Sequence, residues 1–294
     1  MKLLVFGAGF SGRAILSELA SECECAIGTA RSETKRDAIE ATGARALVYD
    51  GAITDELADA MASATHLVQS IAPDHQAETG SGDPLLAAVK DGFAGAFPAL
   101  QWIGYLSTVG VYGDHGGEWI DEDTECRPVS RRSKARLAAE DDWRLAAAGA
   151  GRPLAIIRLS GIYGPGRNAF VNLSEGKARR LIKPGQVFNR IHVADIAGAT
   201  AMLARGQTPG TFNVTDEKPA PPQDVVEEAA QISGFRLPPE TDFETADLSP
   251  MARSFYGENK RVSNLRIREA GYRFRYPDYH AGLKALWSEG NWKG

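Results

Sequence analysis

The stretch KLLVFGAGFSG, Lys2–Gly12, decides the fold class of this chain. Its first residues, 2–6, form a short apolar run of the kind that predicts a buried strand. Residues 7–12 then have the spacing GxGxxG, and residues 13–22 continue with the apolar spacing of a helix. A strand, a glycine-rich turn and a helix in direct succession indicate the start of an α/β domain.

Each glycine of this turn has its own geometric reason. Gly7 allows the tight turn, Gly9 lets the backbone approach a pyrophosphate, and Gly12 lets helix and strand pack closely. The helix that follows points its free N–H groups and the positive end of its dipole at the phosphates. We therefore predict a dinucleotide site, with a plain glycine turn as the alternative. Its first contacts are Gly7, Gly9, Phe10, Ser11 and Gly12.

Strand-like and helix-like segments alternate through the first half of the chain. Such alternation predicts a parallel sheet with helices on both faces. Beyond the glycine loop at 161–167 the regularity weakens, with proline-rich breaks at 218–223 and 237–243. We predict an α/β fold, a Rossmann-type doubly wound parallel sheet with a smaller mixed C-terminal substrate lobe. The dinucleotide domain is expected at 1–168 plus 187–217, and the lobe at 169–186 plus 218–294.

Bulk composition argues against several classes of protein. The chain has 294 residues and a net charge of −5, whereas a nucleic-acid partner would require a basic face. No apolar run reaches the length of a membrane span, and no secretory signal precedes the first strand. Cys23, Cys25 and Cys126 lack metal-ligand spacing, and their sparse count fits a reducing compartment. We expect a cytoplasmic protein with no nucleic-acid partner, no membrane association and no metal site.

The end of the second expected strand bears on the choice of cofactor. It continues as Gly28-Thr29-Ala30-Arg31-Ser32. An NAD site has an Asp or Glu here that holds the ribose 2′-hydroxyl, and this stretch has none. Arg31 and Ser32 supply a cation and a hydroxyl, which suit a 2′-phosphate. We therefore predict NADP as the preferred cofactor. NAD is the alternative, in which case Arg31 is an ordinary surface arginine.

The ends of the third and fourth expected strands supply further cofactor contacts. In this type of sheet, ligands lie beyond the carboxyl ends of the parallel strands. Asp50 and Gly51 follow the third strand and are expected beside the adenine. Ser70, Ile71 and Ala72 follow the fourth strand and are expected to flank the pyrophosphate and the nicotinamide.

Together with the N-terminal segment, four later stretches resemble the short-chain dehydrogenase/reductase superfamily in its extended branch of NAD(P)-dependent epimerases and dehydratases. They are LSTVGVYGD (106–114), IIRLSGIYGPGR (156–167), RIHVADIA (190–197) and GTFNVTD (210–216). The resemblance is clear over residues 1–216 and covers the tail only in outline. It implies that Thr108 is a catalytic hydroxyl. It also implies that Leu159, Ser160 and Gly161 pack on the nicotinamide.

One central element departs from the family pattern. The family's next helix carries Tyr-x-x-x-Lys, whose spacing places both side chains on one helix face. There the lysine holds the nicotinamide ribose and lowers the pKa of the tyrosine. This chain has Ser130 and Lys134 at these positions. Lys134 keeps its implied role, but a serine hydroxyl is a much weaker acid than a phenol and reaches less far. Ser130 is therefore either a helix cap or passive polar group, or part of a non-standard site.

Other residues are candidates for the missing proton donor. Tyr163 follows the sixth strand, His115 lies in a glycine- and acid-rich loop, and Tyr112 belongs to the VYG turn. A literal Tyr-x-x-x-Lys occurs at 256–260, beyond the last sheet strand. It contains a glycine and an asparagine, which are poor helix formers, so we do not expect it to be the catalytic pair. The histidine and aspartate of the HVxD stretch are expected to be structural.

Two functions fit these residues. The first is an NADP-dependent oxidoreductase or epimerase of the atypical extended short-chain dehydrogenase type. It would act on a small carbonyl or sugar-like substrate with a non-standard proton donor. The second is a non-catalytic NADP-binding sensor or regulatory protein, which the missing tyrosine favours. The expected partner is a small-molecule substrate, and the chain is expected to be a monomer or a homodimer. The predicted catalytic residues are Thr108, Ser130, Lys134 and Tyr163.

Overall fold

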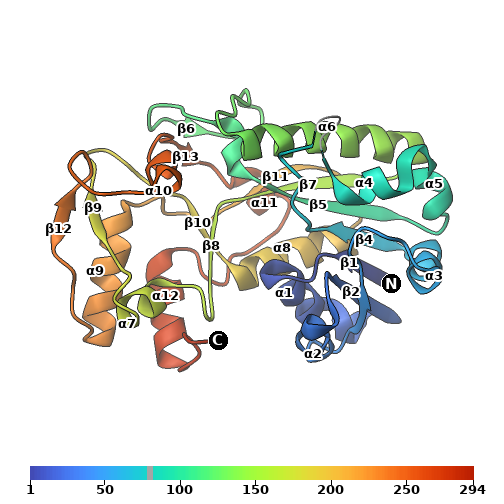
Figure 1. Ribbon diagram of the computed structural model, residues 1–294, viewed down its shortest axis with the longest axis horizontal. Coiled ribbons are helices and arrows are strands. Elements are labelled where there is room, and N and C mark those ends of the chain that lie inside the picture. Colours follow the sequence, from blue (N-terminus) through green and yellow to red (C-terminus); the bar gives the residue numbers. More distant parts are fainter. Residues whose placement is uncertain (78–81) are drawn as a thin grey trace. The chain divides into compact units, whose positions relative to one another are not determined.

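The computed structural model describes residues 1–77 and 82–294, and its largest element is a seven-stranded sheet (Figure 1). The strand order is β11-β7-β5-β4-β1-β2-β3. β1 (Lys2–Phe6) pairs in parallel with both β2 and β4. The chain thus builds outward from β1 to β3, then returns and continues from β4 in the other direction, as a doubly wound sheet does. The other strands are β2 (Cys25–Ala30), β3 (Arg45–Val48), β4 (His66–Gln69), β5 (Trp102–Thr108), β7 (Leu154–Leu159) and β11 (Gly210–Val214).

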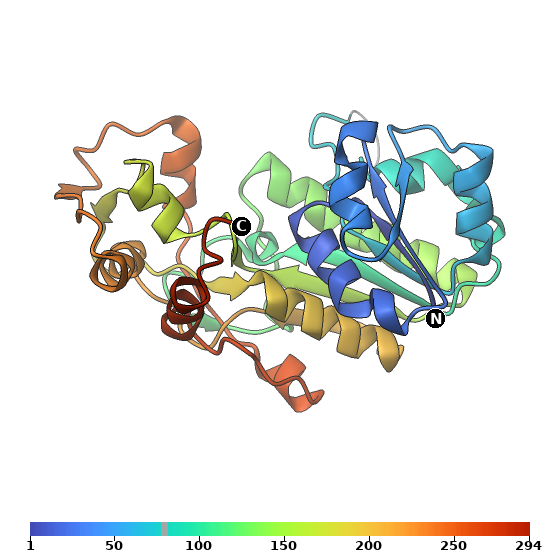
Figure 2. The ribbon, with the colours of Figure 1, turned by 90° about the horizontal axis from the view of Figure 1, so that it is seen from below.

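Helices cover both faces of this sheet. Figure 1 shows α6 on one face and α1 with α8 on the other, and Figure 2 shows α1 and α8 side by side. Successive side chains of a strand point to opposite faces, yet every residue from Leu3 to Phe6 is at most 1% exposed. Burial on both faces explains why β1 is a continuous apolar run. The helices are α1 (Phe10–Leu19), α2 (Arg36–Glu40), α3 (Asp55–Ser63), α4 (Pro84–Val89), α5 (Phe93–Ala96), α6 (Arg131–Ala150) and α8 (Val193–Arg205).

One cluster of apolar side chains fills the space between the sheet and helices α3 to α6. Trp143 of α6 is fully buried at its centre. Its ring stacks on Tyr105 of β5 with centroids 5.9 Å apart and meets the ring of Phe93 edge-on at 5.4 Å. These contacts determine which face of the long helix α6 turns toward the sheet.

The sheet and its helices belong to the first of two compact units, made of residues 1–111, 128–158 and 196–212. The predicted fold class, an α/β doubly wound parallel sheet of Rossmann type, is confirmed. The predicted bounds of the dinucleotide domain, 1–168 plus 187–217, differ from this unit at 112–127, 159–168, 187–195 and 213–217.

The second unit consists of residues 112–127, 159–195 and 213–294. Its core gathers Tyr163, Phe170 and Leu283 with side chains of α9. Its strands form short parallel pairs: β6 (Trp119–Ile120) with β13 (Arg261–Val262), β8 (Gly161–Tyr163) with β10 (Arg190–His192), and β9 (Arg180–Ile182) with β12 (Glu240–Asp242). Its helices are α7 (Ala169–Ser174), α9 (Pro222–Ser233), α10 (Pro250–Phe255), α11 (Leu265–Glu269) and α12 (Tyr279–Ser288).

The HVxD stretch holds the C-terminal segment of this unit. Asp195 is fully buried, and its Oδ1 accepts hydrogen bonds from the Tyr272 hydroxyl at 2.8 Å and the Arg275 N–H at 2.7 Å. Its Oδ2 accepts the Tyr276 N–H at 3.0 Å. Burial lowers the pKa of His192 to about 4, which keeps that imidazole neutral near pH 7. The contacts of Asp195 are those of a structural residue.

Candidate functional site

The glycine turn between β1 and α1 has the backbone that a dinucleotide turn requires. Gly7 has φ of +86°, in the left-handed region that favours glycine. A Cβ on Gly12 would lie only 2.6 Å from the Gly7 carbonyl oxygen, so helix and strand approach more closely than any side chain allows. A Cβ on Gly9 would meet no atom within 4 Å. The backbone at Gly9 is therefore open to a ligand.

The first turn of α1 offers N–H groups to an anion. The helix begins at Phe10 with no acidic residue in its first turn and no side-chain cap. Arg13 is the first residue to close the helix, because its N–H donates to the Gly9 carbonyl at 2.9 Å. The N–H groups of Phe10, Ser11 and Gly12 precede that bond and have no partner within the helix. A pyrophosphate fits this set of donors.

Thr29 of β2 anchors the turn, although no sequence motif marks it. Its Oγ1 accepts the Gly7 N–H at 2.9 Å, and its carbonyl accepts the Ala8 N–H at 2.8 Å. The side chain is 1% exposed. Because the two partners lie far apart in sequence, this contact leaves no local pattern from which it could be predicted.

Arg31 and Ser32 follow β2 and are both exposed. Within residues 1–77 and 82–294, Arg31 has no side-chain hydrogen bond or ion pair, so its guanidinium is free to meet an anion. The hydroxyl oxygens of Ser32 and Thr34 lie 2.9 Å apart. Glu33, the acidic residue of this segment, is paired with Arg36 at 3.1 Å. The end of β2 thus presents a cation and two hydroxyls.

The predicted adenine contacts lie on an exposed turn after β3. Asp50 Oδ1 accepts the Ala52 N–H at 3.1 Å, which closes the turn. Gly51 has φ of +120° and would meet no atom within 4 Å if it carried a Cβ. The turn is therefore shaped by its own contacts and leaves space beside it.

The predicted pyrophosphate contacts after β4 lie against the glycine turn. The Ser70 N–H donates to the Phe6 carbonyl at 2.9 Å. A Cβ on Gly7 would lie 2.7 Å from Cγ1 of Ile71, so these two residues are in direct contact. Ala72 is exposed just beyond them. The first unit therefore brings the segments after β1 and β4 together, and their contact with a pyrophosphate stays a prediction.

Ser130 is the N-cap of α6. Its Oγ accepts the Ser133 N–H at 3.0 Å and donates to the Ser133 Oγ at 2.9 Å. This is the contact pattern of a capping serine. The geometry favours the cap interpretation, and a catalytic role for Ser130 stays a prediction.

Thr108 and the start of α6 lie close together. Thr108 Oγ1 accepts the Gly110 N–H at 3.1 Å. A Cβ on Gly110 would lie 3.0 Å from Ser133 Oγ and 3.4 Å from Thr108 Oγ1, so both hydroxyls lie against Gly110. Lys134 is exposed in the first turn of α6 and has no side-chain hydrogen bond or ion pair in the described part of the chain. The structure thus places Thr108 beside the turn that carries Lys134.

The predicted nicotinamide contacts after β7 belong to the second unit. Leu159 and Ser160 are buried, and the Gly161 N–H donates to the Asn189 carbonyl at 3.0 Å. Ser160 Oγ has no hydrogen-bond partner among the described residues. A buried hydroxyl of this kind is free to bond to a ligand or water, and its cofactor contact stays a prediction.

Tyr163 is enclosed in the core of the second unit. A Cβ on Gly282 would lie 2.0 Å from the Tyr163 hydroxyl oxygen, so the phenol lies against that glycine. Its ring meets the ring of His192 edge-on at 5.1 Å. Burial raises the pKa of Tyr163, whereas proton exchange near pH 7 would need a lower one. These features favour packing, and the predicted catalytic role of Tyr163 stays untested.

The other candidate donors differ in their surroundings. Tyr112 is fully buried and its hydroxyl donates to Asn213 Oδ1 at 2.8 Å. His115 is half-buried, and its Nε2 lies 3.1 Å from the Tyr112 carbonyl oxygen. Since a carbonyl only accepts, Nε2 carries the proton and Nδ1 is the nitrogen left to accept one. His115 is thus oriented, but nothing yet assigns it a substrate.

The literal Tyr-x-x-x-Lys does not lie on a helix. α10 ends at Phe255, before Tyr256. Tyr256 stacks on Phe243 with ring centroids 4.8 Å apart. Lys260 is 5% exposed, and its Nζ donates to the Gly113 carbonyl at 2.6 Å. Tyr256 therefore serves packing, and the Lys260 ammonium group is engaged by the Gly113 carbonyl and by Glu258 Oε2 at 2.6 Å.

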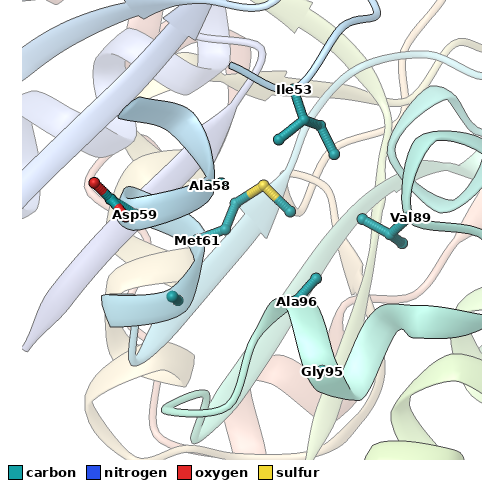
Figure 3. A pocket seen from close by; sticks show the side chains of 8 residues that line it. Ile53, Ala58, Asp59, Met61, Val89, Gly95 and Ala96 are labelled. Carbon is teal, nitrogen blue, oxygen red and sulfur yellow. The ribbon is translucent and has the colours of Figure 1, made fainter. Parts of the chain in front are cut away.

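An apolar hollow of about 410 Å³ lies elsewhere on the first unit (Figure 3). Figure 3 shows Met61 between Ile53 and Val89. None of the predicted cofactor residues lines it, so it does not bear on the dinucleotide site. Its lining residues are Ile53, Ala58, Asp59, Met61, Ala62, Val89, Gly95 and Ala96.

Among residues 1–77 and 82–294, no group of three or more His, Cys, Asp or Glu side chains is placed to hold a metal ion. No helix of these residues combines the length and the apolar character needed to cross a bilayer.

The sequence and the structure were both matched by known proteins. Residues 3–215 match the NAD dependent epimerase/dehydratase family. A search of curated proteins found no match. Among solved structures, a conserved protein of unknown function from Silicibacter pomeroyi DSS is 46% identical, with a TM-score of 0.89. That likeness covers 98% of this chain and 99% of the other.

More distant structures share the fold. A provisionally named NAD-dependent epimerase/dehydratase from Methylobacillus flagellatus is 29% identical, covers 98% of both chains and has a TM-score of 0.72. The human epimerase family protein SDR39U1, solved with NADPH, is 18% identical with a TM-score of 0.73. That match covers 98% of this chain and 99% of the human one.

Proposed function

Because this chain belongs to the NAD-dependent epimerase/dehydratase family, we propose that its first unit binds NADP(H) in preference to NAD(H). The observation that carries the preference is the end of β2, where Arg31 has no partner among the described residues and no carboxylate is free to hold a ribose 2′-hydroxyl. An exposed guanidinium beside the hydroxyls of Ser32 and Thr34 suits a 2′-phosphate. The NADPH bound to human SDR39U1, which shares the fold, is consistent with this proposal.

The rest of the first unit supplies the other cofactor contacts in this proposal. The N–H groups of Phe10 to Gly12 bind the pyrophosphate, and Asp50 with Gly51 lies beside the adenine. Lys134 holds the nicotinamide ribose. Ser70, Ile71 and Ala72 flank the pyrophosphate. When bound, the nicotinamide supplies hydride chemistry.

The reaction that we propose is oxidoreduction or epimerisation of a small carbonyl or sugar-like substrate. Thr108 offers a hydroxyl to the substrate oxygen, because its Oγ1 proton is not needed for the bond it accepts from the Gly110 N–H. A phenol is missing from position 130, and the Ser130 proton is already donated to Ser133. The proton donor is therefore non-standard. The chain acts as a monomer or homodimer, and the cytoplasm is its proposed location.

A second function, an NADP-binding sensor without turnover, is favoured by one observation. Apart from Thr108, the sequence predicts two hydroxyl donors, Ser130 and Tyr163. The Ser130 hydroxyl caps α6, and the Tyr163 phenol is buried against Gly282. A protein that only binds cofactor needs no proton donor.

One paired experiment separates these proposals. Calorimetric titration should give a lower Kd for NADPH than for NADH, and equal values would refute the preference. NADPH oxidation would then be followed over a panel of aldehydes, ketones and sugar nucleotides. Turnover with any member supports the enzyme, whereas tight binding with no turnover supports the sensor. Failure to bind either dinucleotide would overturn both.

A further inference from the structure

A buried carboxylate outside the predicted cofactor contacts joins three segments of the first unit. Asp83 is 2% exposed and caps α4, with its Oδ1 accepting the N–H groups of Leu85 at 3.0 Å and Leu86 at 3.1 Å. Its Oδ2 accepts the indole N–H of Trp143 from α6 at 3.0 Å. Both oxygens also lie 3.1 Å from Nε2 of Gln69, the last residue of β4.

The capping of α4 does not by itself account for this arrangement. A cap requires only a side-chain oxygen near the first-turn N–H groups, and it works at a surface. Here the carboxylate is buried, which raises the pKa of Asp83 and is costly. Two side-chain donors, Gln69 and Trp143, offset that cost. The Asp83 carboxylate therefore also holds β4 and α6, which carry these two donors.

Gln69 is fully buried, and its neighbours determine how its amide is oriented. The NH₂ group faces the Asp83 carboxylate, which only accepts hydrogen bonds when ionised. Its Oε1 faces the Ile71 N–H at 3.4 Å, which only donates. The reversed amide would set oxygen against oxygen and N–H against N–H. Asp83 thus directs Oε1 of Gln69 at the backbone of Ile71.

That backbone is part of the predicted cofactor site. A Cβ on Gly7 would lie 2.7 Å from Cγ1 of Ile71 and 3.1 Å from its nitrogen, so Ile71 lies directly on the glycine turn. The start of α4 is also tied to the adenine side, because the Tyr49 hydroxyl donates to the Pro84 carbonyl at 2.7 Å. Tyr49 immediately precedes Asp50. The segments after β3 and β4 are thus both fastened to the N-terminus of α4.

We propose that Gln69, oriented by Asp83, is a positioning residue for the pyrophosphate and nicotinamide half of the dinucleotide. This inference rests on the proposed NADP(H) binding. Gln69 touches no part of the cofactor and acts through Ile71, which it holds against the glycine turn. Loss of this hold releases the segment 70–72 but leaves the segment 31–34, at the other end of the cofactor, unchanged.

The test compares two ligands with the variant Gln69→Met, which keeps the length of the side chain and removes both polar groups. The first ligand is NADPH. The second is adenosine 2′,5′-bisphosphate, which carries the adenosine half of NADP without the nicotinamide nucleotide. We expect the Kd for NADPH to rise roughly tenfold, the worth of about one hydrogen bond. The Kd for the bisphosphate should stay within about twofold of the wild-type value.

The matched control is Trp143→Phe, which removes a different donor from the same carboxylate. It should lower the melting temperature, as Gln69→Met does, because each leaves Asp83 with fewer partners. It should not weaken NADPH binding, because the bond between Gln69 and Ile71 is kept. A merely structural role for Gln69 would make both variants alike in both measurements.

The outcomes are distinguishable. Suppose that the wild-type protein binds NADPH. An unchanged Kd for NADPH in Gln69→Met, or an equal rise in the Kd values of both ligands, would then overturn the inference and leave the proposed function standing. Failure of the wild-type protein to bind NADPH would instead overturn the proposed function. If Gln69→Met does not fold, hydrogen exchange of the wild-type protein decides. Slow exchange of the Ile71 amide supports the hold, and exchange as fast as that of an unbonded amide refutes it.

Discussion

At the end of β2, two arginines close in sequence have different surroundings. Arg36 pairs with Glu33 at 3.1 Å and with Glu40 at 3.7 Å, whereas Arg31 has no ion pair in the part of the chain that the structure describes. We expect Arg31→Gln to raise the Kd for NADPH roughly ten- to hundredfold, since a hydrogen bond to a charged group contributes about 1.5–3 kcal/mol. The Kd for NADH should not change. Arg36→Gln is the matched control and should leave both values near wild type; equal effects of the two substitutions would contradict a 2′-phosphate contact at Arg31.

Removing the Ser130 hydroxyl tests whether this residue is only the N-cap of α6. Ser130→Ala removes the bond to the Ser133 N–H and should lower the free energy of unfolding by about 1 kcal/mol. Affinity for NADPH should stay within about twofold. Thr54→Ala, which removes the cap of α3, is the comparison, and thermal unfolding measures both. A large loss of NADPH binding in Ser130→Ala alone would mean that the serine does more than cap.

Asp216 makes the stability of the second unit dependent on pH. Burial raises its pKa to about 8 from 3.8, so the folded protein holds a proton that the unfolded chain releases between these values. Its contribution to stability is full below about pH 4 and is lost as pH rises toward 8. Asp216→Asn does not titrate, so its melting temperature should fall less than that of wild type between pH 5 and pH 8. Thermal melting at pH 5 and pH 8 measures this difference, and substitution of the exposed Asp247 in Asp247→Asn is the control. An equal fall in melting temperature for wild type and Asp216→Asn would refute the attribution of the pH dependence to Asp216.

At the scale of elements, one buried carboxylate fastens α6 to the sheet. Glu140 of α6 is fully buried and accepts the Ser107 hydroxyl at 2.6 Å and the Arg158 guanidinium at 2.7 Å and 3.1 Å. Replacing it by Ala leaves the buried Arg158 without its counter-charge, which should cost about 3–5 kcal/mol of unfolding free energy. Arg144 pairs with the same carboxylate at 3.1 Å but is 41% exposed. Arg144→Ala should therefore cost less than about 1 kcal/mol.

Denaturant unfolding of both variants measures this difference. Similar losses in Glu140→Ala and Arg144→Ala would show that the buried pair does not fasten the helix.

The sequence predicts some elements of the site and not others, for a physical reason. Gly7 and Gly12 could be predicted because their backbone geometry excludes every other residue, so the requirement appears in the residue type itself. Gln69 and Asp83 could not be, because their contact depends on how β4 and α4 pack and leaves no spacing signature. Tyr256 and Lys260 show the opposite case, in which a sequence motif is present without a site. Their spacing would place both side chains on one face only if the residues lay on a helix, and α10 ends at Phe255.

At the scale of the whole molecule, composition does not mark the division into units. The chain passes between the units five times, and the proline-rich breaks at 218–223 and 237–243 both lie beyond the last passage. Two of these passages fall inside continuous strands, at 158/159 in β7 and at 212/213 in β11. A strand that serves two units has the same apolar pattern throughout, so composition does not mark the boundary.

The stability of the whole chain offers the last test of cofactor choice. A ligand that binds only the folded state stabilises it by RT ln(1 + [L]/Kd), about 2.7 kcal/mol at one hundred times Kd. NADPH should therefore raise the melting temperature by several degrees, and NADH at the same concentration should raise it less. In our proposal this difference comes from an exposed ion pair between Arg31 and the 2′-phosphate, which salt screens, so the difference should narrow at about 1 M NaCl. Arg31→Gln should abolish the difference at low salt, and a difference that persists in this variant would place the 2′-phosphate elsewhere.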